Sequence, residues 1–417
     1  MIKAIKGTKD ILPDSIGKWK YVENIISSVF KYYNYSEIRT PIFEETLLFA
    51  RGIGEATDIV GKEMYTFEDR SKTSVTLKPE MTASVVRAFI EHSLGKKHSL
   101  NKLYYISPMF RQERPQAGRL REFHQFGAEA LGSSSPLLDV EMISMAYDIL
   151  SGLGLKDLTI KINSLGTPES RKNYTQKLRE YLKDKKHLLS GESKERIDKN
   201  ILRIFDSKID NDIEVMKDAP LLLDFLDNES KDNFEHVKSL LTSSNIPFEI
   251  DASLVRGLDY YTKTTFEIIS GKVGSQDALC GGGRYDLLVE QFGGEPTPGT
   301  GFAAGIERIL IACEKENSFA VSESSINLYI VCLVKTLVAK AYELAQSIRR
   351  NNICVEMDYI GRSVKAQMRE ANKLNSEFVL FFGGEEYSEG KVQLKNMKNG
   401  TQELVKIENL VNKISGD

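Results

Sequence analysis

The sequence predicts an α+β protein whose first domain carries a helical insertion and whose C-terminal part forms a separate α/β domain. Three observations support this organisation. Two strand-like runs, residues 102–113 and 121–131, flank a loop containing Pro and Gly, as in an antiparallel hairpin. Residues 167–243 are rich in Lys, Glu, Asp and Ser, with Leu and Ile at helical spacing. From about residue 325, strand-like and helix-like runs alternate.

Length and composition describe an ordinary folded chain. Its 417 residues exceed what one hydrophobic core usually supports, so two or three domains are expected. Hydrophobic residues make up 41% and charged residues 28%, which is typical of a water-soluble protein. Because the net charge is only -3, any contact with nucleic acid must use local patches.

Several classes of protein are excluded by the same reading. No apolar run approaches the length of a membrane span, and residues 1–14 lack the apolar core of a signal peptide. The cysteines contain no C-x-x-C pair, which argues against a zinc site and a disulfide framework. The five histidines also lack metal-like spacing. We therefore expect a cytoplasmic protein with no membrane contact and no metal held by protein side chains.

The first domain is expected to begin with a long amphipathic helix at 16–34, where apolar residues recur every three or four positions. A short strand at 36–45 is broken at Pro41, because proline cannot donate to a ladder. Residues 73–94 predict a strand, a turn and a helix that starts at about Met81. The hairpin is followed by two further elements, a helix near 137–153 and a strand at 158–166.

After the helical insertion, residues 251–270 return to strand chemistry. The glycines at 281–283 predict a tight turn that brings Tyr285 toward a pocket, and no Lys-Ser/Thr follows them as in a phosphate loop. Residues 301–316 begin as a strand and continue as a helix. In the last domain, strands are expected at 326–334, 353–359, 378–386 and 391–397, and helices at 335–351, 362–374 and 408–414.

One face of the predicted hairpin gathers unusual chemistry, because side chains alternate between the two faces of a strand. The expected set is Met109, Arg111 and Glu113 on the first strand, and Phe123, Gln125, Gly127 and Glu129 on the second. Arginine binds phosphate bidentately, and an aromatic ring can hold a flat base. The alternative is a cluster of surface ion pairs, which would stabilise the fold little.

These residues resemble motif 2 of the class II aminoacyl-tRNA synthetases, which reads F-R-x-E, a loop, and then R-x-x-x-F. Here it spans 110–113 and 119–123. The stretch GFAAGIER at 301–308 resembles motif 3, with Ala303 in place of the middle glycine. Residues 16–41, ending in proline, resemble motif 1.

Four further stretches resemble the histidyl-tRNA synthetase family. They are LVRGLDYYT at 254–262, GGGRYD at 281–286, KGTKDILP at 6–13 and TLKPEMT at 76–82. In the last one, Lys78 and Met81 stand where bacterial members commonly have Arg and Gly. The resemblance covers the whole chain. It implies a class II catalytic domain, an antiparallel sheet flanked by helices, at 1–166 and 244–320, a helical insertion at 167–243 and an anticodon-binding domain at 325–417.

The resemblance also implies how ATP binds on the sheet. Arg111 would hold the α-phosphate with Arg256 as the second, catalytic cation, and fixed cations there stabilise the charge that grows in the transition state. Glu113 would contact the adenine edge and Phe123 one adenine face, while Arg308 would cover the other face and reach the γ-phosphate. Arg119 or Arg121 is expected to assist. Mg²⁺ would bridge phosphate oxygens. For Arg256 the alternative is a structural arginine.

For the amino acid, the resemblance implies a pocket that binds the imidazole ring and the α-ammonium group. Glu129 can accept from one ring N–H, and Tyr261 can bond the other ring nitrogen. The remaining candidates are Glu80, Thr82, Gln125, Tyr260 and Tyr285. Tyrosines in such runs often belong to the core instead. His124 should point away from Gln125 and be structural, and no editing domain is apparent.

The implied activity is the joining of histidine to its tRNA through histidyl-adenylate, by a homodimer formed through motif 1. Two alternatives remain. One is the non-catalytic, histidine-sensing regulatory subunit of the short-form ATP phosphoribosyltransferase, which usually lacks the anticodon domain and parts of these motifs. The other is an RNA-binding regulator built on the same scaffold. In the last domain, the candidates for RNA contact are Arg349, Arg350, Tyr359, Arg362, Lys365 and Arg369.

Overall fold

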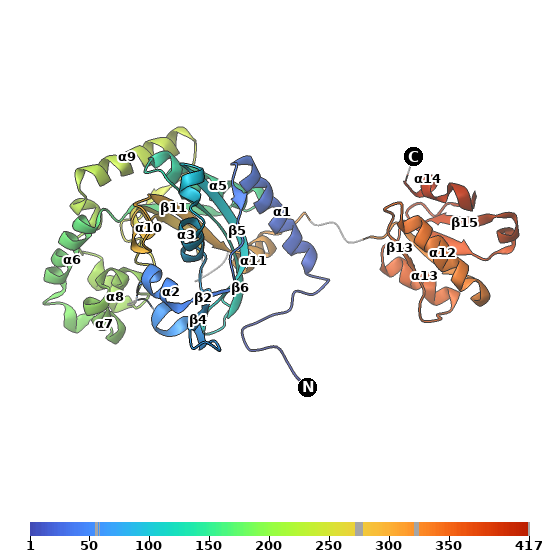
Figure 1. The fold of residues 1–417 in the computed structure, drawn as a ribbon, viewed down its shortest axis with the longest axis horizontal. Coiled ribbons are helices and arrows are strands. Elements are labelled where there is room, and N and C mark those ends of the chain that lie inside the picture. The colour runs from blue at the N-terminus through green and yellow to red at the C-terminus, as the bar shows by residue number, and fades with distance from the viewer. Residues whose placement is uncertain (55–56, 58, 272–277, 321–324, 416–417) are drawn as a thin grey trace. The chain divides into compact units, whose positions relative to one another are not determined.

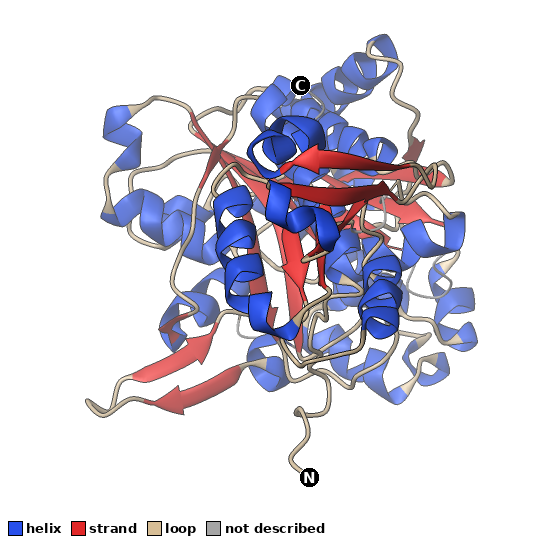
Figure 2. Cartoon of the chain, turned by 90° about the vertical axis from the view of Figure 1, so that its right-hand side faces the viewer, coloured by secondary structure: helices blue, strands red, loops and turns tan. Residues whose placement is uncertain are grey.

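The computed structural model describes residues 1–54, 57, 59–271, 278–320 and 325–415. The chain divides into two compact units, Met1–Ala320 and Val321–Asp417 (Figure 1). The chain contains both helices and strands (Figure 2), and both kinds of element occur in each unit, as the α+β prediction requires. Within the described residues, no helix is both long and apolar enough to cross a membrane.

The first unit is built on an eight-stranded sheet in the order β1–β5–β6–β11–β10–β9–β7–β8. All neighbours are antiparallel except the edge pairs β1–β5 and β7–β8. The strands are β1 (Ser36–Glu37), β5 (Asn101–Phe110), β6 (Glu122–Leu131), β7 (Leu158–Ser164), β8 (Glu249–Ile250), β9 (Thr262–Ser270), β10 (Ala278–Arg284) and β11 (Gly299–Gly305).

One face of this sheet is covered by helices. Strands β6 and β11 turn Phe126, Ala128, Phe302 and Ala304 toward that side, where they join one hydrophobic core. The covering helices α1 (Ile16–Tyr32), α5 (Pro136–Gly152), α9 (Asn228–Ser243) and α11 (Ile306–Glu316) contribute to the same core. Because every second side chain points the other way, the opposite face stays open for a site.

The local signals in the sequence explain where these helices lie. Helix α1 buries Trp19, Val22, Ile26 and Phe30, the three- and four-residue spacing that predicted it. Helix α5 starts after Ser135, whose hydroxyl accepts from the Leu137 amide, and Pro136 occupies the first turn. Both helices begin and end within a few residues of the predicted limits.

The region predicted as a helical insertion consists of helices and 3₁₀ turns. Its α-helices are α6 (Pro168–Leu182), α7 (Gly191–Lys199), α8 (Asp210–Met216) and α9, with 3₁₀ turns η2 (Lys186–Leu188), η3 (Ile201–Asp206) and η4 (Leu222–Phe225). Figure 1 shows α6, α7 and α8 gathered at one edge of the unit. They share a second hydrophobic core with Tyr260, Tyr261 and Tyr285. By contrast, α9 packs on α5 and β9 of the main sheet.

A small sheet, β2–β4–β3, and several helices complete the first unit. Pro41 separates β1 from β2, so the predicted broken strand is confirmed, and its halves join different sheets. The elements are β2 (Phe43–Glu45), α2 (Thr46–Ile53), the π-helical turn η1 (Ile59–Glu63), β3 (Tyr65–Glu68), β4 (Ser74–Leu77), α3 (Thr82–Glu91), and the short helices α4 (Leu94–Lys97) and α10 (Leu288–Gln291).

The second unit has a five-stranded sheet in the order β13–β12–β14–β15–β16, with the first three strands parallel. Its elements are β12 (Leu328–Cys332), η5 (Lys335–Leu337), α12 (Val338–Arg349), β13 (Val355–Met357), α13 (Val364–Lys373), β14 (Phe378–Phe382), η6 (Glu385–Glu389), β15 (Lys391–Asn396), β16 (Gln402–Lys406), η7 (Ile407–Asn409) and α14 (Leu410–Ser415). The predicted α/β pattern is confirmed, and β16 was missed.

The predicted glycine turn is wrong, because residues 281–283 lie inside strand β10. Glycine is required there by close packing. A Cβ atom on Gly282 would lie 2.3 Å from the Gly301 carbonyl oxygen, and one on Gly281 would lie 2.2 Å from Nη2 of Arg256. The strand expected at 251–270 is also shorter than predicted, since β9 starts at Thr262 and an irregular loop precedes it.

A buried ion pair joins the end of β10 to the start of α5. Arg284 and Asp139 are both almost fully buried, and Nη2 of the arginine lies 2.8 Å from Oδ1 of the aspartate. The same guanidinium donates to the carbonyl oxygens of Ser133 and Ser135 at 3.0 Å. All of these bonds depend on one side chain, so its removal would leave the buried Asp139 carboxylate without its cation.

We predict that Arg284→Met lowers the free energy of unfolding of the first unit by about 3–5 kcal/mol, the usual result of breaking a buried pair from one side. Urea titration followed by the fluorescence of Trp19, the only tryptophan, reports this unit. As a control, Lys72→Ala removes an exposed pair with Glu68 and should change stability by less than about 1 kcal/mol. Equal effects of the two variants would contradict the prediction.

Candidate active site

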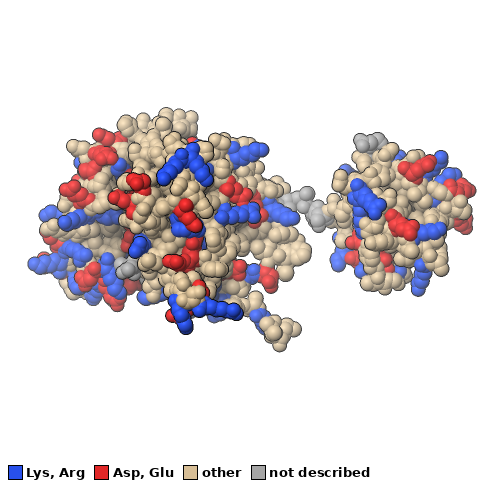
Figure 3. Space-filling model, viewed as in Figure 1, with Lys and Arg blue, Asp and Glu red and all other residues tan. Residues whose placement is uncertain are grey.

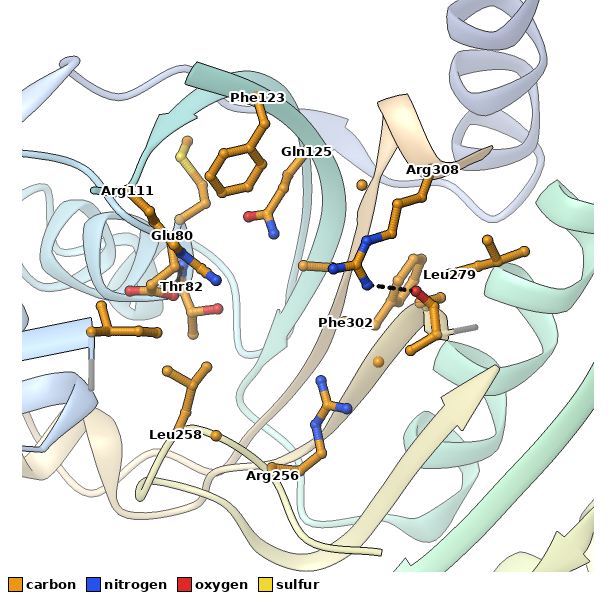
Figure 4. Close-up of a pocket in the computed structure, with 18 of the residues that line it drawn as sticks. Glu80, Thr82, Arg111, Phe123, Gln125, Arg256, Leu258, Leu279, Phe302 and Arg308 are labelled. Atoms are coloured by element: carbon orange, nitrogen blue, oxygen red, sulfur yellow. Dashed lines mark hydrogen bonds between the residues drawn. The ribbon is translucent and has the colours of Figure 1, made fainter. Parts of the chain in front are cut away.

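A cavity of about 250 Å³ lies on the sheet face away from the covering helices. Figure 4 shows Arg111, Glu80 and Thr82 on one side of it, with Arg256 and Arg308 on the other. The wall includes side chains from β6, β10 and β11, from the start of α3, and from the loop before β9. The site therefore depends on segments that are far apart in the sequence.

The floor of the cavity is a row of small residues on adjacent strands. Gly127, Ala303 and Gly281 are direct cross-strand neighbours on β6, β11 and β10, and Glu267 continues the row on β9. The Arg256 guanidinium lies over Gly281, where any side chain would displace it. The glycine at position 281 thus lets a cationic side chain approach the backbone.

The hairpin face is arranged as predicted. Phe123 pairs with Met109 and Gln125 with Ser107 across β5 and β6, so these side chains share the cavity face. Beyond the end of β5, the Arg111 guanidinium lies 5.3 Å from the centre of the Phe123 ring and donates to the Pro79 carbonyl at 2.9 Å. This bond and ring contact aim Arg111 into the cavity.

Three arginines lie near this end, and two of them share one carboxylate. Glu113 lies 3.6 Å from Arg111 and 3.3 Å from Arg119, while Arg308 donates to the Ala278 carbonyl at 2.9 Å. Burial is the largest cause that lowers the pKa of Arg308, and the positive charge of Arg119 is the second. The positive charges of these arginines therefore lie close together, and a polyphosphate in the cavity would interact favourably with them.

Arg256 occupies the opposite side of the floor. Its Nη1 lies 2.6 Å from the Glu267 carboxylate, and its guanidinium lies 5.9 Å from the centre of the Tyr261 ring. Its Nε is buried without a hydrogen-bond partner among the described residues. The side chain is thus oriented by Glu267 and retains a donor that can bind a ligand.

The deepest acidic group is Glu129. Its carboxylate accepts from the Thr82 hydroxyl at 2.7 Å and from the Tyr285 hydroxyl. A Cβ on Gly301 would overlap this carboxylate, which explains the glycine there. Burial raises the pKa of Glu129 to about 8, although the bonds from Tyr285 and Thr82 oppose the shift. A cationic or N–H ligand above it would stabilise the charged form.

Glu80 is the second buried acid. It accepts from the backbone amides of Thr82 and Ala83 at 2.8 and 2.9 Å, at the start of helix α3. Burial also raises the pKa of Glu80, against these two bonds. Burial likewise raises the pKa of Tyr260 and Tyr261, so both hydroxyls stay protonated and can donate at neutral pH.

Four buried polar atoms of residues that line the cavity have no hydrogen-bond partner among the described residues: the Gln125 Oε1 atom, the Tyr105 hydroxyl, and the Nε atoms of Arg119 and Arg256. Buried polar groups are usually paired, so these atoms are candidates for ligand contacts. Sequence analysis missed Tyr105 and Glu267. Side chains alternate along a strand, so the residue four positions before Met109 shares its face, and this pattern could have identified Tyr105. Glu267 could have been found as the only carboxylate of strand β9, between Phe266 and Ile268.

The structure brings most of the predicted residues to the cavity wall. Those that line it are Glu80, Thr82, Arg111, Glu113, Arg119, Phe123, Gln125, Arg256, Tyr260, Tyr261, Tyr285 and Arg308. Glu129 lies beneath the wall, bonded to two of these residues. Arg121 is the exception. It is not among the lining residues, and its Nε faces the Glu113 carbonyl at 3.4 Å while its stem packs on Gly7.

His124 points to the opposite face of the sheet, as alternation predicted. Its backbone amide and Nδ1 contact the Glu307 carboxylate, and its ring packs edge-on against Trp19. No group of three or more His, Cys, Asp or Glu suited to a metal occurs within the described ranges.

The raised pKa of Glu129 leads to a stability prediction for the ligand-free protein. The ordinary value is 4.5 and the folded value about 8, so the folded state binds more protons between these limits and loses stability as pH rises. Between pH 6 and 8, unfolding free energy should fall by about 2 kcal/mol more in the wild type than in Glu129→Gln. Urea titrations at several pH values measure this difference. Parallel pH dependences would contradict it.

Comparison with known proteins identifies the family. The sequence model described as histidyl-tRNA synthetase matches residues 7–309, and the one described as anticodon binding domain matches 327–417. A histidine–tRNA ligase of Halothermothrix orenii is 47% identical over 410 residues, 98% of each chain. One from a Geobacillus species is 49% identical over 409 residues, 97% of each chain.

Solved structures agree with the sequence relatives. The crystal structure of apo S. aureus histidyl-tRNA synthetase has a TM-score of 0.84 and 39% identity, covering 99% of this chain and 100% of the other. A Bacillus halodurans structure titled ATP phosphoribosyltransferase regulatory subunit/histidyl-tRNA synthetase has a TM-score of 0.66 at 21% identity, with 91% and 98% coverage. This second likeness concerns the fold alone. The chain belongs to the histidyl-tRNA synthetase family, within the class II aminoacyl-tRNA synthetases.

Proposed function

We propose that the protein is a histidine–tRNA ligase, which activates histidine with ATP and transfers it to the 3′ end of tRNA(His), releasing AMP and pyrophosphate. The observation that carries this proposal is the convergence of Arg111, Arg256 and Arg308 on one cavity beside the buried Glu129. Full-length relatives at 47% and 49% identity bear the same name.

For the first step, the substrate carboxylate would attack the α-phosphorus of ATP, and pyrophosphate would leave. No protein base is needed, because the carboxylate is already the nucleophile, so positioning and charge stabilisation suffice. Arg111 and Arg256 approach from opposite sides and would bind the α-phosphate oxygens. Phe123 and Glu113 would hold the adenine, and Arg308 the base and γ-phosphate, with Arg119 nearby. These cations would stabilise the charge that grows at phosphorus.

The histidine side chain would bind at the inner end of the cavity. Glu129 would accept a hydrogen bond from the imidazole, and Tyr261 would bond its other nitrogen. Glu80, Thr82, Gln125, Tyr260 and Tyr285 complete the candidate pocket. A pocket that hydrogen-bonds both ring nitrogens would reject amino acids lacking them by a large factor, since buried polar groups would be left unpaired.

The residues present also fit Mg²⁺ bound together with ATP. This ion usually binds through one or two carboxylates plus substrate phosphates, and Glu113 and Glu267 both line the cavity. When bound, it would neutralise phosphate charge. In the ligand-free arrangement, the two carboxylates orient Arg111 and Arg256 instead.

The second unit would bind the anticodon of the tRNA, as its family description implies. On the face visible in Figure 3, its basic and acidic side chains are interspersed, which favours local contacts over one broad basic patch. Tyr359 is 61% exposed and could stack on a base. Arg349 and Arg362 already bond within the unit, to the Val355 carbonyl and to Glu370. A cytoplasmic location follows from the proposed role in protein synthesis.

A homodimer through the segment around Pro41 is part of the same proposal. Three apolar side chains of this segment, Ile42, Phe43 and Leu47, are 40–54% exposed in the single chain. Burial of such residues is what a second copy would provide.

The regulatory-subunit alternative shares the fold but requires no adenylate chemistry. The retention of all three arginines and of a C-terminal unit that matches the anticodon binding domain favours the ligase. An RNA-binding regulator without activation is the remaining alternative.

The first test is histidine-dependent exchange of pyrophosphate into ATP without tRNA. We expect the wild type to catalyse it and Arg256→Ala to reduce kcat roughly 100- to 1,000-fold, as for loss of one transition-state donor. Lys177→Ala, which removes an exposed cation of α6, is the matched control and should behave as wild type. A folded wild type without exchange for any amino acid would overturn the ligase proposal and favour a histidine sensor or RNA-binding regulator.

The dimer prediction is tested by light scattering after size exclusion. We expect the wild type to have twice the chain mass of 47.0 kDa, and Phe43→Glu to shift toward 47.0 kDa because it places a charge in the buried surface. Leu404→Glu changes an equally exposed apolar residue in the other unit and should remain dimeric. A dimeric Phe43→Glu variant would exclude this surface.

A further inference from the structure

The loop that carries Arg256, Tyr260 and Tyr261 into the cavity has little regular structure of its own. It connects β8 to β9 and contains turns and bends at 252–260. Its Asp259 amide donates to the Ile53 carbonyl at 3.2 Å. The geometry of these three side chains must therefore come from contacts with neighbouring elements.

Helical-region side chains supply those contacts. Arg171 on α6 donates through Nη1 to the Asp259 carbonyl at 3.4 Å and through Nη2 to the Tyr261 carbonyl. Asn200 donates to the Asp259 carboxylate at 2.7 Å. Arg203 makes a longer contact of 3.5 Å with the Gly257 carbonyl. One planar guanidinium thus spans two carbonyls on either side of Tyr260.

Arg171 differs from the other arginines in the adjoining cavity of about 230 Å³. Arg203 lies 2.7 Å from Asp206, and Arg179 lies 4.0 Å from Asp198. For Arg171, no carboxylate lies within 4 Å in the part of the chain that is described. Burial lowers its pKa, against the pull of Asp259, but arginine remains protonated. Its hydrogen bonds are therefore directed at loop backbone rather than at a paired acid.

Hydrogen bonds at the start of α6 hold the backbone of Arg171 in place. Asp227 accepts from the hydroxyls of Thr167, Ser170 and Ser230 at 2.9, 2.7 and 2.9 Å. Although burial opposes them, these bonds lower the pKa of Asp227 below its ordinary value, so the carboxylate stays charged at neutral pH. Since Arg171 follows Ser170 directly, its backbone is held by this network.

We infer that Arg171 is a positioning residue for histidine activation. It holds the loop through the carbonyls of Asp259 and Tyr261, and so sets the direction of Arg256 and of the two tyrosines. This inference rests on the proposed ligase function. The helical region then acts as a support for the catalytic loop, in addition to any contact it makes with tRNA.

The test compares Arg171→Ala and Arg171→Lys with Arg179→Ala in pyrophosphate exchange. We expect kcat to fall roughly 10- to 100-fold in both Arg171 variants, because a displacement of about 1 Å can cost that much. Lysine keeps the charge but cannot span two carbonyls, so it should not rescue. The KM for histidine should rise and the KM for ATP stay within about twofold. Millimolar guanidine should partly restore Arg171→Ala.

Arg179→Ala is the matched control on the same helix and should keep wild-type exchange kinetics. A lysine variant with wild-type kinetics would overturn the inference, even where the alanine variant fails to fold. Hydrogen exchange of the 255–261 amides gives a second measurement that needs no activity. We expect the amide hydrogens to exchange faster in the Arg171 variants than in Arg179→Ala, and equal hydrogen-exchange rates would overturn the inference. Absence of pyrophosphate exchange in the wild type would contradict the proposed function instead.

Discussion

Four guanidinium groups converge on one cavity, and keeping them together without an anionic ligand is the constraint on which the site depends. Arg111 and Arg119 share Glu113, Arg256 pairs with Glu267, and Arg308 donates to a backbone carbonyl. Arg111 and Arg119 come from the loop between β5 and β6, Arg256 from the loop before β9, and Arg308 from α11. The antiparallel sheet matters because it brings these segments side by side at fixed spacing.

The same constraint explains why the floor is made of glycine and alanine. A side chain at Gly281 would displace Arg256, and one at Gly301 would overlap the Glu129 carboxylate. A substitution at either glycine would therefore require the charged side chain beside it to move. The Arg256 guanidinium therefore lies against a glycine of β10, and the Glu129 carboxylate lies against a glycine of β11. The opposite face of these strands is covered by helices that form the main core.

Much of the fold could be predicted because the relevant signals are local. Helix α1 follows from its apolar spacing, the β5–β6 hairpin from alternation around a Pro- and Gly-containing loop, and the second unit from alternating runs. The glycine turn was predicted wrongly because glycine normally marks turns, whereas here it permits a guanidinium to lie on a central strand. Motif reasoning also placed Arg121 with the ATP contacts, although it is not among the residues that line the cavity.

The sequence by itself determined the element types, the face of the hairpin that carries Phe123 and Gln125, and the motifs that indicated the family. These features depend on residue spacing along one segment. Only the tertiary structure decided which distant groups meet, such as Glu267 with Arg256, Thr82 with Glu129, and Arg171 with the loop before β9. The reason is physical: such contacts depend on how strands pair and helices pack, and this information is spread over the whole chain.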